Sequence, residues 1–301
     1  HHRYLHSFPT RRSSDLVQKM GGKDHVYISF SGGKDSTVLL HLVRSIFPDV
    51  VAVFSDTGLE FPEIKEFVKS VDNCITIRPK LSFREILLKY GYPIVSKEVC
   101  DTIYYSKKNS NSFRFKQKLS GELKGKSMYD QSKWAYLLDA PFDCNANCCR
   151  LMKKEPFREF KKINKKYPII GTTVSESLLR KRAWTLNGCN NFTKGNEKSA
   201  PLSLFTENDI WAYIRKYNLA YSKIYDMGYK RTGCVFCAFG AHLEKPYNRF
   251  DQLKLTHPNL YNYMMKPIDQ GGLGFRIPLD YIGVKEKDNI QQNLELFIDT
   301  D

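Results

Sequence analysis

The sequence predicts an α/β protein with a doubly wound, mostly parallel five-stranded sheet and with helical and cysteine-rich additions. Short apolar segments occupy residues 25–30, 50–54, 74–78 and 168–172, and helical patterns separate the first three. The segment 50–54 is apolar throughout, as expected of a parallel strand that is buried on both faces. Right-handed crossovers between such strands place helices on both sides of the sheet.

A glycine-rich stretch, Ser31-Gly32-Gly33-Lys34-Asp35-Ser36, follows the first predicted strand and begins a helix with one apolar face. Glycine permits a tight turn and lets a ligand approach the backbone closely. The free N–H groups at the start of a helix, together with the helix dipole, attract an anion. Lys34 adds a positive charge, and the two serines supply hydroxyl donors. The stretch is therefore predicted to bind phosphate, with an ordinary glycine-rich turn as the alternative.

Two further segments follow predicted strands and are expected at the carboxyl edge of the sheet, where ligands bind in open α/β sheets. The first, residues 55–63, contains Asp56 and Thr57, and a plain turn is its alternative. The second begins at Gly171 and carries the cations of residues 180–182. These cations are placed to contact an anionic group, unless they only cover a solvated helix face.

Composition and charge limit the function classes. The 301-residue chain is 42% hydrophobic and 13% aromatic, so it can bury a full core. Its formal net charge of +15 suits a phosphate-rich partner such as a nucleotide, tRNA or DNA, and a lysine-rich solvated surface is the alternative. No stretch approaches the roughly 18 consecutive apolar residues of a membrane-spanning helix. We expect a cytoplasmic protein without a membrane partner.

Residues 80–142 are irregular in pattern and strongly basic, with aromatic residues interleaved among the charges. This combination suits a nucleic acid, which binds through phosphate contacts and base stacking. The alternative is a helical insertion whose aromatic side chains pack inward while its lysines face solvent. The aromatic residues concerned are Phe113, Phe115, Tyr129, Trp134 and Tyr136.

The remaining local patterns are structural. Residues 187–199, rich in Asn, Gly and Lys, predict a mobile loop. Thr206 and Asp209 have the spacing of a capping box and predict a helix that follows them.

The chain is expected to have three parts. Its first 16 residues resemble translated sequencing-adapter read-through, so we expect the native chain to begin near Met20. Residues 1–19 are then a non-native or disordered tail, residues 20–240 the main domain, and residues 241–301 a C-terminal extension.

Eight cysteines in a chain expected to be cytoplasmic indicate a metal or a cluster and not a disulfide framework. Cys234 and Cys237 have the C-x-x-C spacing of two ligands to one centre, and the adjacent Cys148 and Cys149 can supply two more. An adjacent pair fits an iron–sulfur cluster better than a tetrahedral zinc ion; zinc and unligated thiols are the alternatives. Cys144 is a substitute ligand. The cysteines expected to pack or stay free are Cys74, Cys100 and Cys189.

The spacing of residues 31–36 differs from that of a Walker loop. The stretch resembles the PP-loop, Ser-Gly-Gly-x-Asp-Ser, of the ATP pyrophosphatases, which implies adenylyl transfer with release of pyrophosphate. Over about residues 26–240, the chain resembles the phosphoadenosine phosphosulfate (PAPS) reductase family, which implies an adenine nucleotide alpha hydrolase-like fold. The motifs that carry this resemblance are SGGKDS, SDTGLEFPE, CCRLMKKEP, Glu176-Ser177-x-x-Arg180, PLSLFTENDIWAYI and GCVFC.

The resemblance, together with the strand-end positions, assigns candidate roles. The cysteine pattern resembles the 4Fe-4S signature of adenylyl-sulfate reductases, which implies that Cys148, Cys149, Cys234 and Cys237 ligate a 4Fe-4S cluster. Lys34 and Arg180 are expected to stabilise charge on the α phosphate, with Asp35 as a third catalytic residue; Asp35 or Asp56 would hold Mg²⁺. The candidate nucleotide-binding residues are Ser29, Ser31, Gly32, Gly33, Lys34, Asp35, Ser36, Asp56, Thr57, Gly171, Glu176, Ser177 and Arg180.

Two departures from the reductases favour ATP as the nucleotide. The sequence carries no C-terminal Glu-Cys-Gly-(Leu/Ile)-His motif, whose cysteine attacks the sulfonucleotide in those enzymes. Its PP-loop is also intact, whereas reductases tend to carry a degraded one. Both features resemble the ATP sulfurylase small subunit or the sulfur-handling member of DNA phosphorothioation systems, and they imply a sulfur-transfer partner protein. The alternatives are a sulfonucleotide reductase whose tail is lost or supplied in trans, and a non-catalytic iron–sulfur module that binds nucleic acid.

Overall fold

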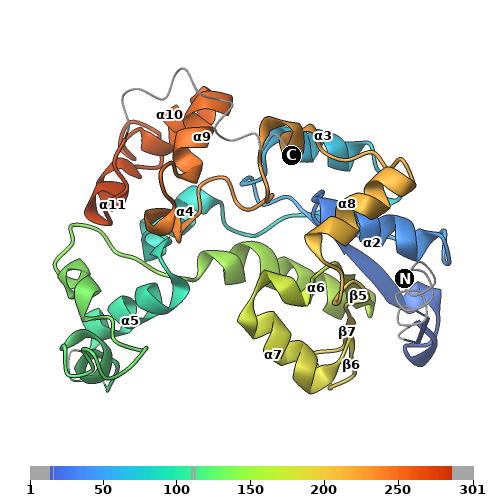
Figure 1. Cartoon of the computed structure of the whole chain (residues 1–301), viewed down its shortest axis with the longest axis horizontal. Coiled ribbons are helices and arrows are strands. Elements are labelled where there is room, and N and C mark those ends of the chain that lie inside the picture. The colour runs from blue at the N-terminus through green and yellow to red at the C-terminus, as the bar shows by residue number, and fades with distance from the viewer. Residues whose placement is uncertain (1–13, 16, 110, 112, 287–301) are drawn as a thin grey trace. The chain divides into compact units, whose positions relative to one another are not determined.

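The computed structural model describes residues 14–286 except 16, 110 and 112 (Figure 1). Its main sheet has the strand order β3-β2-β1-β5-β7-β6, and all neighbouring strands are parallel except the pair β6–β7. The predicted α/β class with a mostly parallel sheet is therefore confirmed. The strands are β1 (Val26–Phe30), β2 (Ala52–Ser55), β3 (Cys74–Ile77), β5 (Tyr167–Ile170), β6 (Asn190–Asn191) and β7 (Lys198–Ser199).

The sheet has six strands where five were expected. The difference arises in residues 187–199, predicted to be a mobile loop, which contain the short antiparallel pair β6–β7. The composition of this segment gives no strand signal, but Ser199 pairs with Ile169 of β5 and is fully buried. Its hydroxyl lies 2.6 Å from the side-chain oxygen of Asn190 and donates a hydrogen bond to it. Pairing with an existing sheet edge thus overrides the local propensity.

Strand β1 lies at the point where the strand order reverses. Ile28 pairs with Ala52 of β2 on one side and with Ile169 of β5 on the other, and all three side chains are buried. In a doubly wound sheet, ligands bind beyond the carboxyl ends of the strands at such a reversal. The segments that follow β1 and β5 are therefore the ones expected to form a site.

The chain divides into two compact units, each made of two stretches. The first unit comprises residues 1–79 and 154–232 and contains the six-stranded sheet. Its helices are α2 (Lys34–Arg44), α3 (Pro62–Lys69), α6 (Glu155–Asn164), α7 (Leu178–Asn187) and α8 (Glu207–Lys216), with 3₁₀ turns η1 (Lys23–His25), η5 (Val174–Glu176) and η6 (Lys223–Met227). The predicted capping box is confirmed, because Thr206 caps α8 and its side chain accepts from the N–H of Asp209.

The second unit comprises residues 80–153 and 233–301, so the expected boundary near residue 240 falls inside it. A parallel pair of two-residue strands, β4 and β8, joins its two stretches. Phe275 lies in its core and packs edge-on against Tyr92, with ring centroids 5.0 Å apart. Its elements are α4 (Phe83–Tyr90), β4 (Ile94–Val95), α5 (Lys97–Lys108), η2 (Phe115–Leu119), η3 (Ser132–Leu138), η4 (Arg150–Lys154, which ends at the boundary), β8 (Ala238–Phe239), η7 (Ala241–Leu243), α9 (Arg249–Thr256), α10 (Pro258–Met265) and α11 (Arg276–Tyr281).

The predicted tail, residues 1–19, lies outside the described residues except for 14, 15 and 17–19. The last 15 residues of the sequence, 287–301, also lie outside them. Among the described helices, none is both long enough and apolar enough to cross a membrane.

The turn after β1 needs glycine at residue 32 both for its positive φ and for its close contact with α3, and two substitutions can separate these effects. Gly32 has a φ of +73°, and a Cβ added there would lie 2.8 Å from Cγ2 of Ile64 on α3. Gly58 has a similar φ of +75° but open space around it. We predict that Gly58→Ala lowers the free energy of unfolding by about 1–2 kcal/mol, the cost of a left-handed conformation. Gly32→Ala should cost roughly 1–3 kcal/mol more, because α3 must also shift.

Urea denaturation followed by circular dichroism measures both values. Equal losses for the two variants would contradict the close approach of α3 to Gly32.

Candidate functional site

The predicted phosphate-binding stretch forms the turn between β1 and α2. The N–H of Ser31 donates to the hydroxyl oxygen of Ser36 at 3.2 Å, and the two hydroxyl oxygens lie 3.1 Å apart. Ser36 also donates to the carbonyl of Gly33 at 2.8 Å. The serine side chains thus hold the turn in shape. Ser29 lies within β1, where it pairs with Val53 and Ile170.

The start of α2 has the features of an anion site. Gly33 precedes the helix and supplies no side-chain cap, so the first N–H groups of α2 depend on partners outside the helix. One such partner is Tyr225, whose hydroxyl accepts the N–H of Lys34 at 2.8 Å. A Cβ on Gly33 would lie 2.5 Å from Oγ1 of Thr232, so the segment 225–232 lies directly on the turn. Sequence analysis missed Tyr225, because it is 191 residues away from Lys34 and lies in no recognised motif.

Lys34 differs from the expectation that it lies on a ligand-facing turn. Only 6% of the residue is exposed. Its Nζ donates to the carbonyl of Lys230 at 2.8 Å and pairs with Oε1 of Glu207 at 3.0 Å. It also lies 5.3 Å from the ring centroid of Tyr225. The four-carbon side chain is long enough for the ammonium to reach these groups. The ammonium therefore connects α2 to Lys230 and Glu207.

Carboxylates gather around this ammonium. Burial raises the pKa of Asp35, the charge of Lys34 opposes that rise, and the charges of Glu176 and Glu207 add to it. Asp35 therefore takes up a proton more readily than an exposed aspartate does. Among the described residues, no group of three or more His, Cys, Asp or Glu is arranged to hold a metal ion. The role of Asp35 in holding Mg²⁺ stays a prediction.

The segment after β5 lies beside the turn, as the strand order predicts. A Cβ on Gly171 would lie 3.2 Å from the carbonyl oxygen of Asp35, so Gly171 permits this close approach. Farther on, Arg180 forms an ion pair with Glu176. The hydroxyl of Ser177 accepts from the N–H of Arg180 at 3.3 Å and so caps α7. The structure thus brings Glu176, Ser177 and Arg180 together, and their nucleotide contacts remain predicted.

The segment after β2 forms a turn whose polar groups are satisfied within the protein. Asp56 pairs with Lys65 at 3.0 Å and with Arg78 at 3.4 Å. Burial favours a raised pKa for Asp56, but the hydrogen bonds and charges of these neighbours outweigh it and lower the pKa. The N–H and hydroxyl of Thr57 both donate to the carboxylate of Glu60, at 3.0 and 2.6 Å. This geometry supports the turn alternative for these residues and leaves nucleotide and Mg²⁺ contacts untested.

The four cysteines predicted as ligands all belong to the second unit. Cys237 directly precedes β8, which pairs with β4 through Ile94 and Ala238. The N–H of Cys237 donates to the carbonyl of Cys234 at 3.1 Å, so the C-x-x-C segment forms a tight turn. Cys148 is buried and Cys149 half-buried.

Their electrostatic interactions show that these thiols lie near one another. A hydrogen bond with Cys149 raises the pKa of Cys148, and so do burial and the charges of Cys149, Cys237 and Cys234. The same bond lowers the pKa of Cys149 to about 5, against burial and with help from Lys97 and Lys153. Positive charge from Lys97 and Lys153 thus acts on this thiol pair, as it would beside a thiolate ligand. In the part of the chain that the structure describes, however, the four cysteines are not placed as a group that could hold a metal ion, so their joint ligation of a cluster stays a prediction.

The other four cysteines lie outside the predicted ligand set. Cys100 is fully buried, and its thiol donates to the carbonyl of Ile94 at 3.0 Å. Burial raises the pKa of Cys100, followed by its hydrogen bond with Cys144, which is also buried. Cys189 accepts from Nε1 of Trp184 at 3.2 Å. Burial raises the pKa of Cys74 on β3, with Arg44 opposing.

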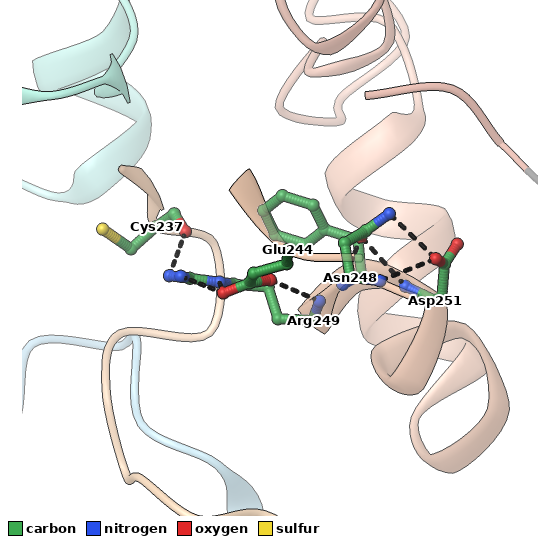
Figure 2. Close-up of polar contacts among 6 residues, drawn as sticks. Cys237, Glu244, Asn248, Arg249 and Asp251 are labelled. Atoms are coloured by element: carbon green, nitrogen blue, oxygen red, sulfur yellow. Dashed lines mark hydrogen bonds and ion pairs between the residues drawn. The ribbon is translucent and has the colours of Figure 1, made fainter. Parts of the chain in front are cut away.

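Arg249 contacts the C-x-x-C turn at Cys237, as Figure 2 shows. Its Nη1 donates to the carbonyl of Cys237 at 3.1 Å, while its Nε donates to Glu244 at 2.9 Å. Asn248 begins α9 with a capping box in which its side chain accepts from the N–H of Asp251. Burial raises the pKa of Cys237, and the positive charge of Arg249 opposes that rise. Sequence analysis missed Arg249, because no spacing connects it to the cysteines.

The chain matches the model of one protein family over most of its length. The family model described as the phosphoadenosine phosphosulfate reductase domain matches residues 25–93 and 94–239. The chain belongs to this family. An uncharacterized protein of Methanocaldococcus jannaschii is 27% identical over 239 residues, which are 78% of this chain and 45% of that protein. The PAPS reductase family chain thus spans less than half the length of this relative.

A second relative is named adenosine 5'-phosphosulfate reductase, from Bacillus thuringiensis. It is 26% identical over 222 residues, which are 71% of this chain and 74% of the relative. Two solved structures are distantly similar. A PAPS reductase from Candida auris has a TM-score of 0.44 at 18% identity, covering 75% of this chain and 87% of that one. The U34-tRNA thiolase NcsA of Methanococcus maripaludis, solved with its [4Fe-4S] cluster, has a TM-score of 0.38 at 12% identity, covering 95% and 82%. Scores this low carry no argument about the site.

The position of Lys34 leads to a test of its structural role. Lys34→Met removes a charged donor from the carbonyl of Lys230, and we predict a loss of about 1.5–3 kcal/mol in the free energy of unfolding. Glu207→Gln is the matched control, because it removes the ion pair but keeps the contact with Lys230. The Glu207 side chain is 60% exposed, so this change should cost about 0–1 kcal/mol.

Chemical denaturation of both variants gives these values. Full stability of Lys34→Met would mean that the ammonium points to the ligand side, as the sequence predicted.

Proposed function

We propose that this member of the PAPS reductase family binds ATP at residues 31–36 and transfers AMP to an acceptor in sulfur metabolism or sulfur modification, with release of pyrophosphate. The observation that carries the proposal is the intact SGGKDS turn at the start of α2, on the strand where the sheet order reverses. The free N–H groups of the first helical turn suit the β and γ phosphates. This assignment makes pyrophosphate the leaving group.

The reaction is a displacement at the α phosphorus. An oxygen of the acceptor attacks phosphorus, and the bond to the bridging oxygen between the α and β phosphates breaks. Negative charge grows on the α phosphate and on the departing pyrophosphate. Lys34 and Arg180 would supply positive charge, and Mg²⁺, which Asp35 or Asp56 would hold, would supply more. A hydroxyl acceptor would lose its proton to solvent or to a nearby carboxylate, whereas an oxyanion acceptor has no proton to lose.

In our proposal, ATP exchanges partners with Tyr225. The hydroxyl of Tyr225 accepts the N–H of Lys34 at 2.8 Å. A phosphate oxygen is a stronger acceptor than a phenol, because it carries negative charge. In our proposal, the phosphate takes over this N–H. A phosphate at this position also competes with Glu207 for the ammonium of Lys34.

For the cysteines we propose a 4Fe-4S cluster held by Cys148, Cys149, Cys234 and Cys237. The electrostatic proximity of these thiols and the nearby cations Lys97 and Arg249 support it. Zinc is the competing metal. The cluster would supply structural and electrostatic support to the second unit.

A second candidate function is sulfonucleotide reduction, which the similarity to adenosine 5'-phosphosulfate reductases favours. That chemistry needs a cysteine nucleophile. Four described cysteines lie outside the proposed cluster. Cys100 and Cys144 are buried, and Cys74 has a pKa raised by burial, so none of these three combines the accessibility and the low pKa that such attack requires. The fourth, Cys189, is half-buried, and its sulfur accepts a hydrogen bond from Nε1 of Trp184. We therefore rank reduction second.

The cluster proposal predicts iron. Protein purified without oxygen should be brown and carry about four iron atoms per chain, as four thiolates on a 4Fe-4S cluster require. Cys149→Ser should lose iron, while Cys74→Ser is the control and should keep it, because Cys74 lies on β3 in the other unit. Metal analysis and absorption spectroscopy measure both. Colourless protein with stoichiometric zinc would overturn the cluster and leave the adenylyl-transfer proposal standing.

The reaction proposal predicts the product. Purified protein with ATP, Mg²⁺ and an oxyanion or nucleic-acid acceptor should release pyrophosphate in an acceptor-dependent way and should release no sulfite from adenylyl sulfate with thioredoxin. Coupled pyrophosphate and sulfite assays measure both products, with Arg180→Ala as an inactive control. Sulfite formation at the usual enzymatic rate of about 1–1000 per second would establish the reductase alternative instead. Cys144→Ser would then be the first variant to make.

A further inference from the structure

The second unit contains a basic and aromatic surface that the proposed chemistry does not use. We call residues 104–109 and 113–136 the basic-aromatic surface. These 30 residues include eight Lys or Arg and two Asp or Glu, a net charge of +6 out of +15 for the whole chain. A tenth of the sequence therefore carries two-fifths of its net charge. Aromatic residues make up seven of the 30, a larger share than the 13% of the whole chain.

Most cations of this surface are not neutralised by the protein. Lys107 pairs with Asp143 at 3.0 Å, and Lys118 pairs with Glu98 at 2.6 Å. The charge of Arg114 acts on Asp101. In the part of the chain that the structure describes, the other five form no salt bridge, and all five are exposed: Lys108, Lys116, Lys124, Lys126 and Lys133. An anionic partner can pair with them without breaking an existing ion pair.

The aromatic residues divide into two groups. Trp134 is buried, as the helical-insertion alternative predicts. Phe113 and Tyr129 are 70% and 55% exposed, and Tyr105 and Tyr136 are also exposed. That inward-packing alternative therefore holds for only part of the set. Large exposed rings among lysines bury no core surface, so they are available to a ligand.

Cations and rings lie next to one another on this surface. The guanidinium of Arg114 lies 4.8 Å from the ring centroid of Tyr105, and Nζ of Lys118 lies 5.6 Å from that of Tyr129. The N–H of Gln131 donates to the carbonyl of Lys118 at 2.7 Å, which fixes the turn carrying Tyr129 beside η2. Single-stranded nucleic acid presents both phosphate groups and exposed bases, and it binds proteins through lysine–phosphate contacts and through bases stacked on aromatic rings. A duplex hides its base faces and uses only the charges.

We propose that the basic-aromatic surface binds single-stranded nucleic acid, with lysines on the phosphates and Phe113 and Tyr129 stacked on bases. This inference goes beyond the proposed adenylyl transfer and does not depend on it. An acidic protein segment would use the lysines but gain little from the exposed rings, so the rings favour the nucleic acid.

The test measures fluorescence anisotropy of labelled oligo(dT) and oligo(U) of about 15 nucleotides with the full-length protein, at several salt concentrations. Lys124→Glu with Lys126→Glu should weaken binding at least tenfold and reduce the slope of log K against log salt by about 0.7 for each phosphate that the variant no longer neutralises. Phe113→Ala with Tyr129→Ala keeps the charge and should weaken binding roughly tenfold, because the bases no longer stack on these rings. Lys69→Glu with Lys89→Glu is the matched control, because both lysines are exposed, lie outside the surface and give the same change in net charge.

Binding of either oligonucleotide with these reductions in affinity and a control within about twofold supports the proposal and tells DNA from RNA. Equal affinity for a duplex of the same length, an unchanged affinity of the aromatic variant, or an equal reduction in the control would overturn it. Displacement of the oligonucleotide by polyglutamate at equal charge concentration would assign the surface to an acidic protein instead. Thermal unfolding of each variant verifies that it is folded; the substituted side chains are exposed, so no large change is expected.

Discussion

The close packing of three glycines around the start of α2 is the constraint on which the candidate site depends. Gly32 brings the turn against Ile64 of α3, Gly33 brings it against Thr232, and Gly171 brings the end of β5 against Asp35. A Cβ at any of these three positions would lie within 3.2 Å of the neighbouring segment, so a larger residue would push that segment away. Because these approaches are made by backbone, they place N–H groups, and not side chains, at the reversal point of the sheet. That is the arrangement an oxyanion needs.

Negatively charged side chains outnumber positively charged ones around this turn. Lys34 and Arg180 supply two positive charges, and Asp35, Glu176 and Glu207 supply three negative ones when ionised. The site therefore has no excess of positive charge for a triphosphate. A divalent cation that arrives with the nucleotide would reverse this balance and relieve the raised pKa of Asp35. Under our proposal, Mg²⁺ would therefore be needed for the binding of ATP as well as for the chemical step.

The sequence predicted the features that arise from local pattern and missed those that arise from distant contacts. Alternating apolar segments and helices predicted the parallel sheet, and the glycine pair predicted the turn after β1. Burial of Lys34 depends on Glu207 and Lys230, which lie 173 and 196 residues away in the sequence, and no local pattern predicts it. The pair β6–β7 was missed because its pairing with β5, and not its composition, makes it a strand. The cysteine spacing predicts a site shared by an adjacent pair and a distant C-x-x-C, and this site stays a prediction, because no group of three or more metal-ligating side chains is placed to hold a metal ion among the described residues.

The cysteine region shows why a metal would matter for the second unit. Strands β4 and β8 are two residues each, and a pair this short contributes little stability in water. The hydrogen bond with Cys149 raises the pKa of Cys148 first, then burial, and then the charges of the other three thiols. A metal bound by these thiols, as we propose, would release their protons, and its binding free energy would become folding free energy. Arg249 and Lys97 reduce the repulsion among these charges but do not remove it. If the proposed cluster is present, it would therefore hold the two stretches of this unit together more strongly than the two short strands do.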